Sequence, residues 1–391
     1  MSEKQSKNTS NENTVPENQK EIAEANQKAV QGVENQGLLH STWNVVTKAP
    51  DGETTKHTLE KRIFPPEPVD QQRFVSQAPR TIITPSRRKR PERPDNVTLV
   101  FGDAQIGYRN NETFHDETAM SLAQLAIREL MPDRVIFVGD MIDLPNFSSF
   151  VQRSDWQGTA QKSIDRYHEF LAQTRSNAPN AEIVSIEGNH ELRLEKMIRK
   201  DAGELLGIRQ ANQDSMLGVL TMRFLCRMDE LGIESVSGYP NAEYWLNDNL
   251  RATHGTNVAK GGSNAAKYLR ESDTGTIFGH THRLETAYRT MSTRHGGKTI
   301  VASSPGTLAH IDGRVPGYRY SVNDEGGTVK RAEDWQQGMN IVETSETNED
   351  VTPVMFQGNR VKIYGKWYEV PAEDQKEGKL PVARERIVVS R

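Results

Sequence analysis

The fold of this chain is decided by the stretch VIFVGDMID, residues 135–143. Its first four residues form a short apolar run, which is typical of a strand buried on both faces. A glycine and two aspartates follow at once, so the strand ends in a tight polar turn. In an open α/β sheet, ligands bind just beyond the carboxyl ends of the strands. The stretch therefore predicts a core strand that delivers Asp140 and Asp143 to a functional site.

The same arrangement recurs along the chain, because several other short apolar runs end in glycine and ligand-type side chains. The further clusters, in order, are Gly102-Asp103-Ala104-Gln105, Gly188-Asn189-His190-Glu191, Thr253-His254-Gly255 and Gly279-His280-Thr281-His282. Strands are expected at 97–101, 135–138, 182–186, 250–253, 275–278 and 298–303, with helices at 117–130 and 163–173. The alternation indicates the α/β class.

The bulk composition limits the architecture and the function. The chain has 391 residues, 35% of them hydrophobic, and a formal net charge of -4. One core with polar extensions fits this length, and the net charge does not by itself predict nucleic-acid binding. The single cysteine, Cys226, excludes an internal disulfide framework and is expected in the core. No apolar run spans a bilayer and no secretory signal is visible, so we expect a cytoplasmic protein without membrane contact.

Four segments are expected along the chain. Residues 1–38 are polar and should be disordered, and residues 39–94 should hold a small hairpin around the turn at 50–52 and a linker rich in proline and arginine. The catalytic domain is expected at 95–342, with a helical insertion at 192–231. Residues 343–391 should form an extension with a hairpin near Gly365.

The clusters supply the ligands that divalent ions prefer. Carboxylate, amide oxygen and imidazole suit hard or borderline cations, and two ions about 3.5 to 4 Å apart share one bridging carboxylate. Asp140 is the natural bridge because it lies in the middle of the series. Asp103 and Asn189 follow neighbouring strands, and the imidazoles come from His254, His280 and His282.

As an ordered set, the clusters resemble the calcineurin-like metallophosphoesterases over residues 97–313. The resemblance implies a four-layered sandwich of two mixed β-sheets flanked by helices. It also implies two divalent ions, manganese favoured over magnesium, zinc or iron. The first ion would be held by Asp103, Gln105, Asp140 and His282, and the second by Asp140, Asn189, His254 and His280.

The resemblance also assigns roles beside the metals. His190 would protonate the leaving oxygen, oriented by a carboxylate such as Asp143. Arg193 would contact a substrate phosphate, although a plain salt bridge fits it equally well. His115 and His310 are weaker candidates for the edge of the pocket.

One position departs from the family pattern, because Gln105 stands where the family has histidine. An amide oxygen is a harder and weaker ligand than imidazole, so the first ion should bind more loosely and should be manganese or magnesium rather than zinc. The alternative is a vestigial first site and a single bound ion.

These observations predict a metal-dependent phosphoesterase. A nucleic-acid phosphodiester, in DNA or RNA, is favoured as substrate because Arg87–Arg90, Lys260 and Lys267 could hold a polyanion. A phosphomonoesterase acting on phosphoproteins or small metabolites is the first alternative. A non-catalytic interaction scaffold is the second. The oligomeric state is left open.

Overall fold

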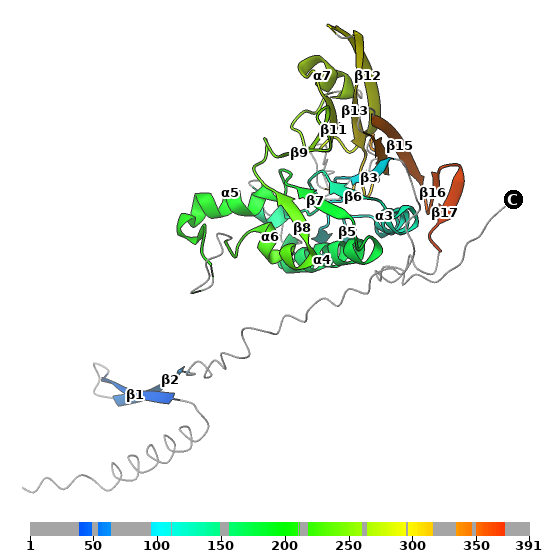
Figure 1. Cartoon of the computed structure of the whole chain (residues 1–391). Helices are drawn as coiled ribbons and strands as arrows, with labels where there is room; N and C mark the ends of the chain where they lie inside the picture. The colour runs from blue at the N-terminus through cyan, green and yellow to red at the C-terminus, as the bar shows by residue number, and fades with distance from the viewer. Residues whose placement is uncertain are drawn as a thin grey trace, which may run out of the picture. The chain divides into compact units, whose positions relative to one another are not determined.

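The computed structural model describes residues 39–48, 54–63, 95–110, 112–148, 156–209, 211, 218–259, 264–294, 296–315, 334–345 and 349–371. The chain divides into two units, residues 1–81 and 82–391. In the first unit, β1 (Leu39–Lys48) and β2 (Thr54–Ile63) pair antiparallel along their whole length, over the stretch for which a hairpin is predicted (Figure 1). The predicted disordered tail and the basic cluster of the linker lie outside the described residues.

An eight-stranded mixed sheet forms the centre of the second unit, in the order β17-β16-β15-β14-β3-β6-β7-β8. Its parallel half consists of β3 (Asn96–Phe101), β6 (Arg134–Phe137), β7 (Glu182–Ile186) and β8 (Ile233–Val236). Its antiparallel half consists of β14 (Gly338–Thr344), β15 (Glu349–Gln357), β16 (Arg360–Ile363) and β17 (Lys366–Glu369). The predicted boundary at residue 343 falls inside β14, which pairs with β3, so the described C-terminal strands continue the main sheet.

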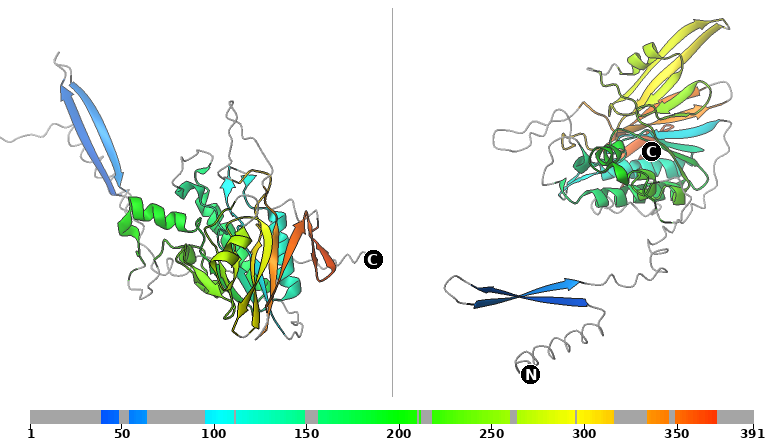
Figure 2. Two further views of the ribbon diagram at one scale, coloured as in Figure 1. Left: turned by 90° about the horizontal axis from the view of Figure 1, so that it is seen from above. Right: turned by 90° about the vertical axis from the view of Figure 1, so that its left-hand side faces the viewer.

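A five-stranded mixed sheet faces the first, in the order β12-β13-β11-β10-β9. Its parallel centre is β10 (Leu250–Thr253), β11 (Gly275–Phe278) and β13 (Gly296–Pro305), and its antiparallel edges are β9 (Glu243–Trp245) and β12 (Leu284–Thr293). The long β12–β13 hairpin projects away from the eight-stranded sheet (Figure 2). A further two-stranded ribbon joins β4 (Tyr108–Arg109) to β5 (Glu112–Thr113).

Helices cover the outer faces of both sheets. The helices α3 (Glu117–Leu130) and α4 (Ala160–Asn177) lie on the eight-stranded sheet, and α7 (Asn264–Glu271) lies on the five-stranded sheet (Figure 1). The region after β7 holds α5 (Leu192–Asp201) and α6 (Met222–Leu225), and single 3-10 turns span Pro145–Phe147, Gly203–Leu205 and Asp229–Leu231. The order helix, sheet, sheet, helix confirms the predicted four-layered α/β sandwich.

Apolar side chains from both sheets form the core that holds the layers at a fixed distance. Val138 and Ile186 from the first sheet pack with Ala252 and Ile277 from the second, and all four are fully buried. Because the central strands are covered on both faces, they read in the sequence as continuous apolar runs. A second cluster packs the other face of the eight-stranded sheet against α3 and α4, and it includes Cys226, as predicted.

The predicted and observed elements agree best where the pattern is strongest. The helix at 117–130 and the strands at 182–186, 250–253 and 275–278 have the predicted bounds, and α4 is longer at both ends than predicted. The predictions omit β8, β9, β12, β14, β15 and α7. None of the ten residues of the edge strand β12 is buried, since five are exposed and five are partly exposed, and its mostly polar sequence offers no apolar run to recognise. Among the described helices, none is both long and apolar enough to cross a bilayer.

A buried ion-pair network ties α3 to α4. The carboxylate of Glu117 accepts hydrogen bonds from Arg166 Nε and Nη2 at 2.9 and 2.6 Å, and it lies 3.0 Å from Nε2 of the fully buried His115. Nδ1 of His115 in turn accepts a hydrogen bond from the backbone of Gly107. Burial acts to raise the pKa of Glu117, but the bonds from Arg166 and His115 outweigh it and lower that pKa to about 2.

The network should make stability depend on acid pH. A carboxyl group whose pKa is lower in the folded state stabilises the fold above its unfolded pKa and loses that contribution as the pH falls toward the folded value. We expect Glu117→Gln to lower the free energy of unfolding by about 2 kcal/mol at pH 7 and to flatten its decline between about pH 4.5 and pH 2. Urea unfolding of both proteins across that range measures this. Parallel pH profiles for wild type and variant would contradict it.

Candidate metal centre

Every candidate metal ligand predicted from the sequence lies just beyond the carboxyl end of a parallel strand. Asp103 and Gln105 follow β3, Asp140 follows β6 and Asn189 follows β7. From the facing sheet, His254 follows β10, and His280 and His282 follow β11. Since these strands run parallel within each sheet and the sheets pack face to face, their ends bring seven side chains to one edge of the sandwich.

The carboxylate of Asp140 lies at the centre of this group. Its Oδ1 accepts a hydrogen bond from the backbone of His190 at 2.9 Å. Its Oδ2 lies 3.3 Å from His254 Nε2, 3.4 Å from Gln105 Nε2 and 3.6 Å from His190 Nε2. Asp140 thus contacts ligands of both predicted ion sites, which is the position expected of a bridging carboxylate.

The first group of ligands gathers around Asp103. Oδ1 of Asp103 lies 3.1 Å from His282 Nε2, and both carboxylate oxygens accept the backbone hydrogen of His280. The amide nitrogen of Gln105 lies 3.3 Å from His282 Nε2. Two buried atoms of this group, Gln105 Oε1 and His282 Nδ1, have no hydrogen-bond partner in the described part of the chain.

The second group gathers around His254. Its Nδ1 donates to the carbonyl of Val138 at 2.8 Å, which turns Nε2 toward the site. That Nε2 lies 3.1 Å from Asn189 Oδ1 and 3.2 Å from His280 Nδ1. Ligand atoms of Asp140, His254 and His280 all lie within 4.8 Å of one another.

The backbone carrying these ligands adopts conformations that side chains disfavour. Five of the seven candidate ligands have φ between 50° and 70°, in the left-handed region: Asp103, Gln105, Asp140, His280 and His282. A residue other than glycine costs of order 1–3 kcal/mol in such a conformation, and such residues cluster at functional sites. The strain is therefore concentrated where the ligands converge.

Hydrogen bonds alone leave the polar atoms of this cluster poorly satisfied. Burial opposes the charge on His254, but the Asp140 carboxylate outweighs it and raises the pKa of His254 to about 10. Burial and the neighbouring His254 lower the pKa of His280 to about 4, so the pair carries one proton rather than two. The single hydrogen on Nε2 of protonated His254 then faces three acceptors at 3.1 to 3.3 Å, namely Asn189 Oδ1, His280 Nδ1 and Asp140 Oδ2. The donor set fits divalent cations, which accept electron pairs from all of these groups at once.

The predicted acid group stands beside the ligands. Nδ1 of His190 lies 3.1 Å from Oδ1 of the buried Asp143, as predicted. Arg193 forms an ion pair with the same oxygen and donates from Nη2 to His190 Nε2 at 2.8 Å. Burial raises the pKa of Asp143, but the Arg193 guanidinium and His190 outweigh it and hold that pKa below its usual value. Of the two roles considered for Arg193, this geometry is that of the salt bridge.

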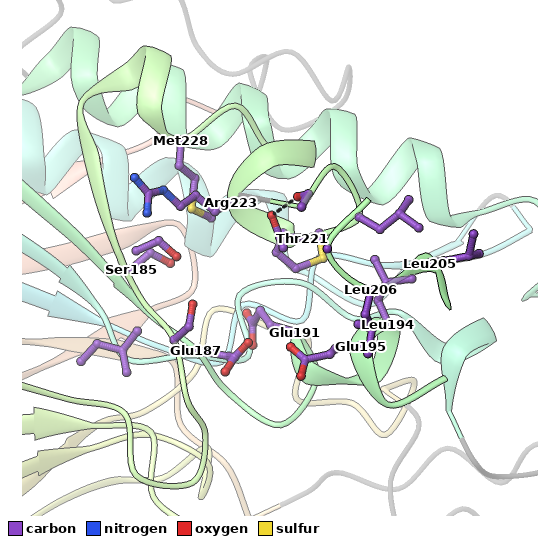
Figure 3. A pocket seen from close by; sticks show the side chains of 17 residues that line it. Ser185, Glu187, Glu191, Leu194, Glu195, Leu205, Leu206, Thr221, Arg223 and Met228 are labelled. Carbon is purple, nitrogen blue, oxygen red and sulfur yellow. Dashed lines mark hydrogen bonds between the residues drawn. The ribbon is translucent and has the colours of Figure 1, made fainter. Parts of the chain in front are cut away.

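Glu191 is a structural member of the site to which the sequence reasoning gave no role. Its Oε2 accepts backbone hydrogens from Gly188 and Asp140 at 2.9 and 3.0 Å, and its Oε1 accepts those of Met141 and Ile142 at 2.8 and 3.4 Å. One carboxylate thus joins the turns that follow β6 and β7. The same side chain lines a pocket of about 130 Å³. Figure 3 shows it there beside Glu187 and Glu195. The position of Glu191 directly after Asn189-His190 was the available signal.

The remaining predicted residues lie away from the ligands. His115 belongs to the Glu117 network, and His310 Nδ1 lies 3.4 Å from Asp116. Lys267 Nζ donates to Asn257 at 2.5 Å in the loop after His254. Lys260 and the basic cluster at 87–90 lie outside the described residues.

The close approach of the β6 and β7 turns supplies a test of the centre. A Cβ added at Gly188 would overlap Oδ1 and the backbone nitrogen of Asp140, whereas one added at Gly203 meets no atom within 4 Å. We expect Gly188→Ala to displace Asp140 and weaken Mn²⁺ binding by at least about tenfold, with Gly203→Ala unchanged. Titration calorimetry measures both, and equal affinities in the two variants would count against the centre.

Comparison with known proteins gives a family match for the region that carries the candidate ligands. Residues 97–284 match the family model described as calcineurin-like phosphoesterase. Among solved structures, Vps29 from Chaetomium thermophilum aligns at 10% identity over 71% of this chain and 97% of its own, with a TM-score of 0.29. A dimetal phosphatase from Danio rerio aligns at 10% identity over 67% of this chain and 96% of its own, also with a TM-score of 0.29. No match was found among curated proteins.

The resemblance stated from the sequence motifs is thereby confirmed. The matched range contains every candidate ligand from Asp103 to His282, and it ends at the first residue of β12. The region that carries the candidate ligands, residues 97–284, thus matches the calcineurin-like phosphoesterase family.

Proposed function

We propose that this chain hydrolyses phosphodiester bonds of a nucleic acid, DNA or RNA, with two divalent metal ions. The family match supports the coarser part, a metal-dependent phosphoesterase. The observation that carries the proposal is the position of Asp140, whose Oδ2 lies within 3.6 Å of a ligand of each ion site and of His190.

The ligands divide between two ions that share Asp140. Asp103, Gln105, Asp140 and His282 would hold one, and Asp140, Asn189, His254 and His280 the other. Such a pair of ions supplies an activated water nucleophile and neutralises charge on the phosphoryl group. Manganese suits this mixed set of oxygen and imidazole ligands, with magnesium, zinc or iron as alternatives.

His190 is the candidate proton donor to the leaving oxygen. Asp143 lies against Nδ1, so it fixes the ring and leaves Nε2 to face the ligands. Arg193 now donates to that Nε2. A substrate phosphate would offer the guanidinium a stronger acceptor, because charge-assisted bonds to phosphate oxygens are favourable. Nε2 would then be free to hold the proton that the leaving alkoxide takes up.

The nucleic-acid substrate rests on basic side chains outside the ligand set. Lys267 is part-exposed near the loop after His254, and the sequence adds Lys260 and Arg87–Arg90. A phosphomonoesterase is the second candidate, since a site of this geometry does not select the substrate. A scaffold without catalysis is the third, and the full ligand set with His190 in place disfavours it.

Manganese-dependent cleavage separates these candidates. We expect the purified chain to cleave labelled single- or double-stranded DNA or RNA, and Asp140→Asn to lose at least about 10³-fold because both ions lose their shared ligand. Asp229→Asn, which changes an exposed aspartate paired with Arg223, is the matched control. Nitrophenol release from p-nitrophenyl phosphate with intact nucleic acid would favour the monoesterase, and near-wild-type turnover by Asp140→Asn would refute the two-ion site.

The role of His190 as proton donor predicts an effect that depends on the leaving group. We expect His190→Ala to keep both ions and to lose about 10²- to 10⁴-fold in kcat on alkyl phosphodiesters. The loss should be much smaller on p-nitrophenyl esters, because nitrophenolate leaves without a proton. Metal analysis and parallel kinetics on the two ester types measure this. Equal losses on both would assign His190 another role.

A further inference from the structure

The two groups of ligands differ in how their imidazoles are held. His254 donates from Nδ1 to the carbonyl of Val138, the usual arrangement that fixes the orientation of a ligating ring. Among the described residues, none forms such a bond with the buried Nδ1 of His282. The polar contacts of this ring, to Asp103 and Gln105, are at Nε2, the atom that faces the ion site, so they do not orient the ring once Nε2 binds an ion. The ring is only 7% exposed.

The ring that packs on His282 is the indole of Trp335. The centroids of the two rings lie 4.1 Å apart with an interplanar angle of 55°, and among the described residues this is the aromatic contact of His282. Trp335 in turn packs on an apolar cluster of Phe114, Trp156, Ala309 and Val315. The indole thus lies between this cluster and the His282 ring.

Backbone and ion-pair contacts hold the Trp335 segment to the segment of His282. The backbone of Gln336 donates to the carbonyl of His282 at 3.1 Å, and its Oε1 accepts from the backbone of Leu284 at 3.3 Å. On the other side of Trp335, Asp334 pairs with Arg283 at 2.8 Å. Asp334, Trp335 and Gln336 therefore all contact the segment 282–284.

We propose that Trp335 is a positioning residue for the first metal ion, holding the His282 ring by stacking in place of the missing hydrogen bond. This inference rests on the proposed metal centre. The first ion would have a single imidazole among its ligands, that of His282, whereas the second would have two, so the first depends most on the orientation of one ring. At the second ion, the His254 ring lies beside Tyr239, with 5.8 Å between the ring centroids, but it is also oriented by the hydrogen bond from Nδ1 to the Val138 carbonyl.

The test is a manganese titration, with free Mn²⁺ followed by electron paramagnetic resonance. The wild-type chain should bind two ions. Trp335→Leu should bind one ion with wild-type affinity and the other about 10- to 100-fold more weakly, the usual effect of losing a group that orients a ligand. The electron paramagnetic resonance signal of two neighbouring bound manganese ions should weaken along with the lost affinity. Trp335→Phe, which keeps a flat ring at this place, should restore most of the lost affinity.

Trp156→Leu is the matched control, because it removes the same side chain from the same cluster. It should lower thermal stability and leave both affinities unchanged. Two ions bound by Trp335→Leu with wild-type affinity would overturn the inference and leave the metal centre standing. An equal loss in Trp156→Leu would also overturn it, since cluster packing would then be the cause. A wild-type chain that binds no manganese would instead refute the centre itself.

Discussion

The burial of the Asp140 carboxylate between the two sheets is the constraint on which the site depends. An isolated buried charge is expensive, and removing one partner of a buried ion pair costs about 3–5 kcal/mol. Asp140 is 2% exposed, so its two oxygens must be surrounded by donors or cations. The backbone of His190 satisfies one oxygen, and the amide of Gln105 and the imidazole of His254 face the other. The remaining ligands are arranged around this group.

Glu191 makes that arrangement rigid. Four backbone hydrogens from two turns converge on its carboxylate, so the turn that carries Asp140 cannot move independently of the turn that carries Asn189 and His190. The apolar core between the sheets sets the remaining distance, because it fixes the ends of β10 and β11 opposite those of β3 and β6. Local strain at five ligands is then sustained by the packing around them.

The two ion sites are consequently unequal. The second site is oriented by a backbone hydrogen bond to His254 and has an anionic, an amide and two imidazole ligands. The first has two carboxylates, an amide and one imidazole, and that imidazole packs on Trp335. Because no hydrogen bond between described residues reaches His282 Nδ1, this ring is less firmly oriented than that of His254, which is a physical reason to expect looser binding at the first site. The first site thus differs in two ways: it has Gln105 where the family has histidine, and its His282 ring packs on Trp335 without a described hydrogen bond at Nδ1.

The sequence by itself determined the class of fold and which residues are candidate ligands. Buried parallel strands must be apolar throughout and must end in turns, so β7, β10 and β11 and the ligands after them could be located from local pattern alone. Only the tertiary structure decided that Glu191 joins two turns, that β14 and β15 complete the main sheet beside β3, and that Trp335 packs on His282. These contacts join residues far apart along the chain, and they depend on how the layers pack. No local period or spacing encodes that packing.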